Sequence, residues 1–320
     1  MTGTLATRKP LTGYHLKLIA LITMFIDHIT VVLVPSGTVY LVLRGIGRIS
    51  FPIYVFLIAE GCRYTSDRFK YAMRLGAFAL ISEIPYDLAL YPAVLEQTGW
   101  GWNFTWRTNV FYTLFFAVAI IHIYETLRRQ SRGRQLLGIG CEAAFFAIVI
   151  LVALYVESPL SIRVMMVVST VYVLAVLLLC RWMEKHPGKP AKPGWLANVL
   201  AVAALIVPVL MAQELGSSYG IFGILVIFLV YLAKDRKWQC IFLSLWMLHE
   251  YVWSTVAAAL QGGAVNMGSA ISWPGFALLS AALIYFAYNG QRGRKAKWGF
   301  YAAYPAHLAI LAAIRALLKV

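Results

Sequence analysis

Six ionisable residues lie within the first three long apolar stretches of the chain. They are Asp27, His28, Arg44, Arg48, Glu83 and Asp87. An ionisable group costs roughly 3 kcal/mol or more inside a bilayer, so the groups retained there usually serve a function. A histidine beside a carboxylate is suited to proton transfer near neutral pH, and an arginine can stabilise a developing anion. We therefore take these six as candidate catalytic residues.

The spacing within two of the stretches places charges on shared helix faces. Arg44 and Arg48 are four residues apart, and so are Glu83 and Asp87. Residues at this spacing share one face of a helix, so the arginines can lie opposite the carboxylates. The alternative is an ion-pair network that only fixes the order of the helices.

Glycines and a proline among these charges indicate an irregular site. Gly45 and Gly47 lie between the two arginines, where they allow a neighbouring backbone to come close. Pro85 lies between the two carboxylates, where it kinks the helix and releases backbone carbonyl groups.

His28 is the candidate general base, and its ring needs a partner. Asp27 is about 100° away from its neighbour on a helix, so it is poorly placed to hold the ring and can pair with an arginine instead. Glu83 is an equally good candidate for orienting the imidazole. With three carboxylates against two arginines, a protonated His28 would balance the charge of the cluster.

A second histidine lies in the last apolar stretch. His307 follows Tyr304 in the segment YAAYPAH, at mid-membrane depth. Both residues are further candidates because they can face the same cavity.

The composition indicates an integral membrane protein. Of the 320 residues, 61% are hydrophobic and 13% are charged, whereas about a quarter of the residues in a soluble domain are charged. We predict an all-α polytopic membrane protein with roughly 10 or 11 transmembrane helices. The predicted helices cover residues 15–35, 38–62, 71–91, 109–127, 135–156, 163–183, 195–212, 218–233, 238–260, 274–289 and 299–318.

The basic residues predict the orientation. Six clusters in alternate loops hold 22 of the 28 lysines and arginines. Such an excess marks cytoplasmic loops, so the net charge of +15 reflects topology and not nucleic-acid binding, and the N-terminus is predicted to be cytoplasmic. Counting 1.5 Å per residue places the six candidate charges roughly 6 to 15 Å below the outer surface. We expect a multi-pass protein of the cytoplasmic (inner) membrane.

The chain is predicted to form a single transmembrane domain. The proline and glycine linker at 186–194 is the nearest feature to an internal boundary. Four cysteines without paired or CxxC spacing indicate neither a disulfide framework nor a metal site.

Several long blocks resemble the TraX family. Both ends of the chain carry the likeness, whereas residues 130–210 and the ninth and tenth predicted helices have no clear match. The blocks are LKLIALITMFIDHI (16–29), LRGIGRISFPIYVFLIAEG (43–61), KYAMRLGAFALISEIPYDLAL (70–90), NVFYTL (109–114), SSYGIFGILVIFLVYL (217–232) and FYAAYPAHLAIL (300–311).

This resemblance implies acyl transfer. TraX is responsible for the N-terminal acetylation of pilin in conjugation, and the family is similar to membrane-embedded acyltransferases that use acyl-CoA. The resemblance thus implies an acetyltransferase with acetyl-CoA as donor, no metal, and a catalytic histidine in the first helix, here His28. It leaves the acceptor open, as a pilin N-terminus, a glycan or a small molecule.

Cytosolic acyl-CoA needs cations for its phosphates near the inner surface. We expect Arg63, Arg68, Lys70 and Arg74 to supply them, together with the cluster at 128–134.

In the buried site, His28 would act as general base or as acyl carrier. Arg44 or Arg48 would stabilise the oxyanion, and Glu83 or Asp27 would hold the ring.

Two other functions fit the same charges. One is a proton-coupled transporter, in which the carboxylates and the histidine relay protons and the arginines bind an anionic solute. The other is a non-catalytic membrane assembly subunit with purely structural ion pairs.

Overall fold

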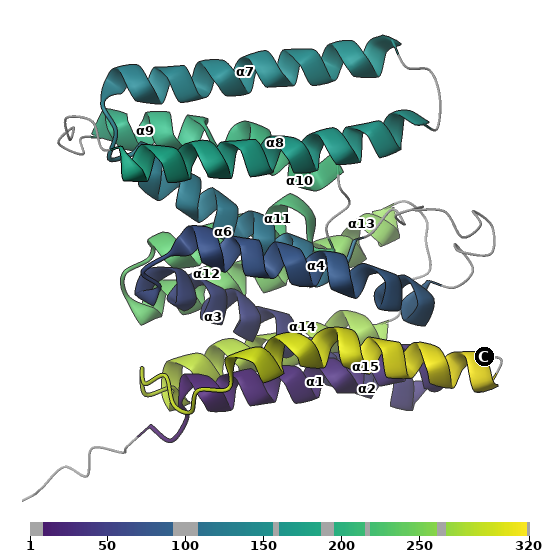
Figure 1. Cartoon of the computed structure of the whole chain (residues 1–320). Coiled ribbons are helices and arrows are strands. Elements are labelled where there is room, and N and C mark those ends of the chain that lie inside the picture. The colour runs from purple at the N-terminus through teal and green to yellow at the C-terminus, as the bar shows by residue number, and fades with distance from the viewer. Residues whose placement is uncertain are drawn as a thin grey trace, which may run out of the picture. The chain divides into compact units, whose positions relative to one another are not determined.

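The computed structural model describes residues 9–91, 108–155, 160–186, 195–214, 218–260 and 267–318 (Figure 1). These residues fold into α-helices, with two π-helical segments, η1 and η2. The helices are α1 (Gly13–Leu33), α2 (Thr38–Gly47), α3 (Ser50–Tyr64), α4 (Arg68–Leu90), α6 (Val110–Leu127), α7 (Arg132–Tyr155), α8 (Leu160–Lys185), α9 (Trp195–Ala203), α10 (Ile206–Glu214), α11 (Gly220–Leu232), α12 (Arg236–Leu248), η1 (His249–Trp253), α13 (Ser254–Leu260), α14 (Met267–Ala282), η2 (Leu283–Ala287) and α15 (Lys297–Leu318).

The helices confirm the predicted all-α architecture, and each predicted apolar stretch overlaps helical residues. Among the described residues, four helical stretches are both long and apolar enough to cross a membrane. They are Gly13–Leu33, Thr38–Tyr64, Val110–Leu127 and Trp298–Leu318. The predicted total of 10 or 11 crossings stays a prediction beyond these four.

Side-chain caps explain where two of the long helices begin. The Thr12 side chain accepts a hydrogen bond from the His15 backbone N–H, and the His15 side chain accepts one from the Thr12 N–H in return. Asn109 caps α6 in the same way, because its side-chain oxygen accepts from the Phe111 N–H at 3.0 Å.

The second predicted helix is broken in the middle of the candidate site. Helix α2 ends at Gly47 and α3 begins at Ser50, whereas we expected one helix over 38–62. The backbone N–H of Arg48 donates to the Gly45 carbonyl at 3.0 Å, a tightened last turn. Arg48 therefore lies at the C-cap of α2 and not within a continuous helix.

The contacts within the chain define two compact units. The first unit holds the described parts of residues 1–61, 84–92 and 229–320, and the second holds those of 62–83 and 93–228. The helices on both sides of the 186–194 linker belong to the second unit, and residues 187–194 lie outside the described part of the chain. The single domain expected from the sequence stays a prediction.

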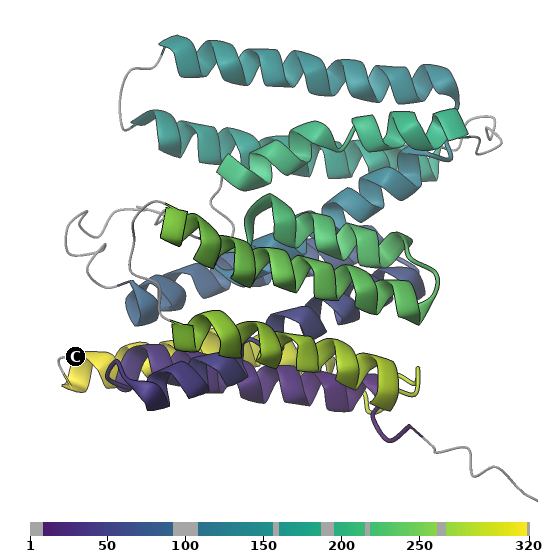
Figure 2. The same cartoon turned by 180° about the vertical axis from the view of Figure 1, so that it is seen from behind.

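In the first unit, helices from both ends of the sequence pack together. Helix α1 contacts α2 and α15, and α14 contacts both α2 and α12. Figure 1 shows α15 alongside α1, and Figure 2 shows α14 alongside α12. This arrangement brings residues of the first and last helices into one layer.

In the second unit, α6 is the central helix. Every residue from Phe111 to Leu127 is buried, and α6 contacts α7, α8, α9 and α10. Gly76 of α4 lies against the Phe115 ring, where a Cβ would approach a ring carbon to 3.2 Å. A glycine therefore permits this close approach of α4 to α6.

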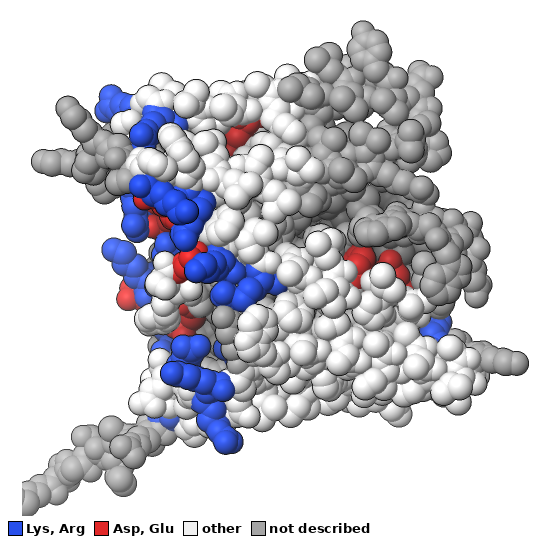
Figure 3. Space-filling model, viewed as in Figure 1, with Lys and Arg blue, Asp and Glu red and all other residues white. Residues whose placement is uncertain are grey.

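The basic loops of each unit gather at one end of its helices (Figure 3). In the first unit, Lys9 Nζ donates to the Tyr285 carbonyl and Arg236 to the Tyr288 carbonyl, each at 2.6 Å. In the second unit, Arg134 donates to the His186 carbonyl at 2.9 Å. This clustering agrees with the predicted alternation of the loops, and the assignment of these ends to the cytoplasm stays a prediction.

Candidate functional site

The predicted base, His28, lies against a second histidine of the first unit. His28 Nδ1 is 2.7 Å from His307 Nε2, and the two ring planes are within 5° of parallel. Tyr304 packs edge-on against both rings, and the centre of the Phe25 ring lies 4.4 Å from the centre of the His307 ring. The structure thus joins three of the predicted residues, His28, Tyr304 and His307, in one cluster.

The hydrogen bonds of this pair define the protonation of both rings in the neutral state. His307 Nδ1 lies 2.9 Å from the Ala303 carbonyl oxygen, which can only accept, so Nδ1 carries the proton. His307 Nε2 is then the acceptor, and His28 Nδ1 is the donor. The lone pair of His28 is consequently on Nε2, which makes no hydrogen bond to any residue that the structure describes. A histidine held in this tautomer is ready to accept a proton at Nε2.

His307 therefore takes the place that we expected for a carboxylate. The expectation that Asp27 or Glu83 holds the His28 ring is wrong at Nδ1, where the partner is His307. Asp27 points elsewhere because consecutive residues are about 100° apart on a helix.

Asp27 pairs with both arginines of the first unit. Its Oδ2 lies 2.6 Å from Arg44 Nη1, and its Oδ1 lies 3.8 Å from Arg48 Nη2. All three side chains are less than a fifth exposed. A Cβ placed on Gly47 would overlap the Asp27 carboxylate, so the glycine makes this close approach possible. The alternative that Asp27 pairs with an arginine is thus confirmed.

Two aromatic residues complete the surroundings of the arginines and were not expected from the sequence. The Arg48 guanidinium carbon lies 4.7 Å from the centre of the Trp273 ring and 5.9 Å from that of Tyr251. Aromatic residues are common in apolar stretches, so neither their type nor their spacing distinguishes these two. Only the packing of α14 and η1 in the first unit identifies them.

Glu83 has a different partner from the one expected. One oxygen of its carboxylate, Oε2, accepts from the Asn109 side-chain amide at 2.6 Å and from the Asn109 backbone N–H at 3.2 Å. Both residues belong to the second unit, where this contact joins α4 to the beginning of α6. Asp87 is buried in the last turn of α4 and belongs to the first unit. The charge balance expected from three carboxylates, two arginines and a protonated His28 stays a prediction, because Glu83 belongs to the second unit and the other five residues belong to the first.

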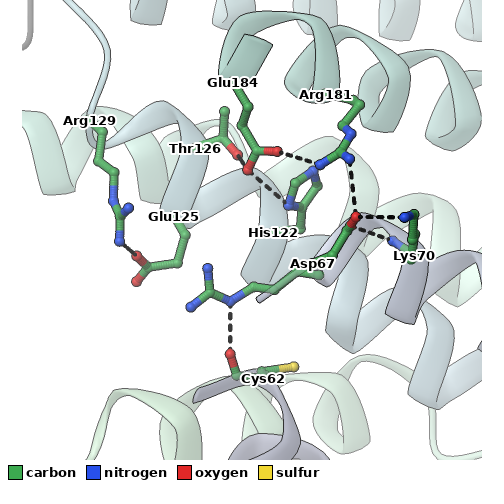
Figure 4. Close-up of polar contacts among 10 residues, drawn as sticks. Cys62, Asp67, Lys70, His122, Glu125, Thr126, Arg129, Arg181 and Glu184 are labelled. Atoms are coloured by element: carbon green, nitrogen blue, oxygen red, sulfur yellow. Dashed lines mark hydrogen bonds and ion pairs between the residues drawn. The ribbon is translucent and has the colours of Figure 1, made fainter. Parts of the chain in front are cut away.

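A second polar cluster lies at the basic end of the second unit (Figure 4). Arg181 Nη2 is 3.0 Å from Asp67 Oδ2, and the backbone N–H of Lys70 donates to Asp67 Oδ1 at 2.9 Å. Burial alone would raise the pKa of Asp67, but this hydrogen bond and the charges of Arg181 and Lys70 outweigh it and hold the pKa below its usual value. His122 Nδ1 lies 3.7 Å from Glu184 Oε1 in the same cluster.

The residues expected to bind the donor phosphates belong to the same unit as this cluster. Arg68 Nε donates to the Cys62 carbonyl at 2.9 Å, and the exposed Lys70 ammonium lies 3.7 Å from Asp67. The Arg74 guanidinium lies over the Tyr71 ring at 5.7 Å. The structure thus places Arg68, Lys70 and Arg74 on the first two turns of α4, whereas Arg63 lies in the last turn of α3.

Comparison with known proteins gives a family and one distant relative. The family of TraX proteins matches residues 12–191 and 165–315. The probable fimbrial assembly protein FimC, serogroup H1, of Dichelobacter nodosus is 28% identical over 113 residues, which are 35% of this chain and 46% of that protein. The chain thus spans about half the length of this relative, and no solved structure matches it. Because the family matches extend from residue 12 to residue 315, the chain belongs to the TraX protein family.

Proposed function

We propose that this chain is a membrane-embedded acyltransferase that moves an acetyl group from cytosolic acetyl-CoA to an amine or hydroxyl acceptor. The hydrogen bond between His28 and His307 carries the proposal, because it leaves a lone pair on His28 Nε2 within an apolar bundle. Membership in the TraX family supports it, since the resemblance implies acetylation. The fimbrial assembly relative favours a pilin-like subunit as acceptor over a glycan or a small molecule.

His28 acts as the general base in this reaction. The acceptor nitrogen or oxygen attacks the thioester carbon while His28 Nε2 takes the proton of the acceptor. The carbon–sulfur bond then breaks, the acetyl group stays on the acceptor, and the leaving thiolate receives the proton from His28 as free CoA. His307 accepts a hydrogen bond from His28 Nδ1 throughout and stabilises the positive charge that the ring gains.

The arginines of the first unit stabilise the negative charge that develops on the thioester oxygen. Attack on the thioester places negative charge on its oxygen, and preorganised donors at such an oxyanion contribute about 10²- to 10³-fold to the rate. Arg44 and Arg48 both pair with Asp27, the residue that precedes His28 in α1, and this supports their assignment to the same site.

The donor is held by its phosphates. We assign this task to Arg63, Arg68, Lys70 and Arg74 at the basic end of the second unit, because cations pair strongly with phosphate oxygens. The protein resides in the cytoplasmic membrane, where cytosolic acetyl-CoA meets this end.

The proposal is tested with the purified chain in lipid nanodiscs and radiolabelled acetyl-CoA. n-Octylamine, an amphipathic amine, serves as acceptor, and both N-octylacetamide and free CoA thiol are measured. We expect equal amounts of the two products from the parent chain and none above background from His28→Ala. His186→Ala is the matched control, because His186 also makes a main-chain contact four residues back, to Trp182 at 3.0 Å.

The proposal would be overturned if the parent chain neither binds acetyl-CoA nor transfers the acetyl group, and if the His28→Ala variant behaves like the parent chain in cells. Such a result would favour the transporter or the assembly subunit.

A further inference from the structure

The two arginines of the site lie against chemically different neighbours. The Arg44 guanidinium makes the short ion pair with Asp27, at 2.6 Å. Arg48 is 3.8 Å from the same carboxylate and lies closer to the Trp273 ring, at 4.7 Å from its centre, than Arg44 does at 5.9 Å. The carboxylate thus lies closer to Arg44, and the Trp273 ring lies closer to Arg48.

These two kinds of neighbour leave an arginine with different capacities. A carboxylate accepts N–H hydrogen bonds and neutralises the positive charge. A guanidinium in a short ion pair therefore has fewer N–H donors and less net charge available for a second anion. An aromatic face attracts the cation through its quadrupole and retains the positive charge for other partners. Arg48 is therefore the better placed of the two to stabilise an anion that appears only during a reaction.

Trp273 is itself fixed by α2, the helix whose C-cap residue is Arg48. Its indole Nε1 donates to the Leu41 carbonyl at 3.1 Å. One turn further along α2, a Cβ on Gly45 would lie 2.5 Å from a Phe276 ring carbon, so α14 packs tightly on the segment that carries both arginines. An aromatic ring anchored on the same helix turns its neighbouring guanidinium into a preorganised group.

From this geometry we propose that Trp273 is a positioning residue that holds Arg48 as the oxyanion-stabilising arginine, while Arg44 serves to hold Asp27. This inference rests on the proposed acyl transfer. It resolves the choice between Arg44 and Arg48 that the sequence leaves open, and it adds a residue of α14 to the site.

Chemical rescue tests the inference. In the nanodisc assay with acetyl-CoA and n-octylamine, Arg48→Ala is expected to lower kcat by about 10²- to 10³-fold with a smaller change in the KM for acetyl-CoA. Added guanidinium chloride should then restore part of kcat, because guanidinium can bind over the Trp273 ring in the vacated position. In the double variant Arg48→Ala/Trp273→Leu, the same additive should restore nothing.

Single variants of Trp273 separate positioning from folding. Trp273→Phe keeps a ring face and is expected to retain more kcat than Trp273→Leu, although both lose the bond to Leu41. Trp253→Leu is the matched control, because Trp253 lies in the same unit with a 57% exposed side chain and should leave kcat unchanged. Melting temperatures of all variants show which of them are folded.

The outcomes are distinguishable from failure of the function itself. A parent chain without any transfer overturns the proposed function. If the parent chain is active but guanidinium restores the kcat of Arg48→Ala and of Arg48→Ala/Trp273→Leu equally, the role of Trp273 is overturned. A larger loss of kcat in Arg44→Ala than in Arg48→Ala, at equal melting temperature, overturns the division between the arginines. If Trp273→Leu does not fold, the double variant Arg48→Ala/Trp273→Phe is tested instead. The inference is supported if guanidinium restores its kcat as strongly as that of Arg48→Ala, and it is contradicted if guanidinium restores none.

Discussion

His28 Nδ1 lies 2.7 Å from His307 Nε2, although 279 residues separate the two histidines in the sequence. The contact joins the first helix of the chain to the last, α1 to α15. Because a backbone carbonyl fixes the proton of His307 on Nδ1, the pair leaves a basic nitrogen on His28 without a carboxylate at the ring. His307 does for His28 what an aspartate does in many hydrolases, but as a neutral acceptor.

The acceptor atom on His307 is the first feature to test. His307→Leu removes it and should lower kcat by about 10²-fold, because the His28 ring loses its tautomer and orientation. His307→Gln offers a side-chain carbonyl and should retain more activity. The measurement is transfer of radiolabelled acetyl groups to n-octylamine, with His186→Gln as control. Equal activity of His307→Leu and the parent chain would contradict the role of the pair.

The ion pair between Asp27 and Arg44 should be visible as thermodynamic coupling. Asp27→Asn leaves two arginines without their carboxylate in an apolar environment and should destabilise the fold by about 3 kcal/mol. In the double variant Asp27→Asn/Arg44→Gln, the loss should be smaller than the sum of the single losses by about 0.5 to 3 kcal/mol. Denaturant unfolding in detergent measures all three variants, and strictly additive losses would argue against the pair.

Gly47 is predicted to be indispensable for the approach of Asp27 to α2. Gly47→Ala places a methyl group in the space of the Asp27 carboxylate, so both stability and transfer should fall. Gly275→Ala is the matched control in α14, because a Cβ there meets no atom within 4 Å. That control should be neutral or stabilising by about 0.5 to 1 kcal/mol. A Gly47→Ala protein with the parent's melting temperature would show that Asp27 does not lie against α2.

Glu83 is expected to act on stability more than on chemistry. Glu83→Leu removes the acceptor for two N–H groups of Asn109 and should cost about 1 to 3 kcal/mol. Glu83→Gln keeps a carbonyl oxygen at this place and should cost less. Unfolding and transfer are measured on the same preparations. Loss of transfer in Glu83→Gln at unchanged stability would instead place Glu83 in the reaction.

The Asp67 cluster predicts a pH dependence of stability. Because the folded protein holds the Asp67 pKa below its ordinary value of about 4, its ion pair with Arg181 contributes stability above that pH. The contribution is lost as the pH falls through the lowered pKa. Asp67→Asn should therefore be less stable than the parent chain at pH 7, and the difference should vanish in strong acid.

Asp235→Asn is the control for this measurement, since the Asp235 side chain makes no capping hydrogen bond to α12. A stability difference between Asp67→Asn and the parent that does not change with pH would contradict the assignment to the carboxylate.

The local features of this fold follow from the sequence. Apolar runs bounded by basic clusters gave the positions of the helices, because backbone groups in lipid must be satisfied within each segment. Glycines at 45 and 47 predict the close approach of a neighbouring backbone, but the nearest atoms in the structure belong to the side chains of Phe276 and Asp27. The break at Arg48 was not predicted, because an apolar run does not show where a last turn tightens.

The sequence by itself determined which residues carry charge within the apolar stretches. Only the tertiary structure decided their partners, and it joined His28 to His307, Asp27 to Arg44, Glu83 to Asn109, and Arg48 to Trp273. The physical reason is that helix periodicity is local, whereas a hydrogen bond or an ion pair depends on distances of 3 to 4 Å that packing alone sets. Helices distant in the sequence supply two of these four partners, His307 and Trp273.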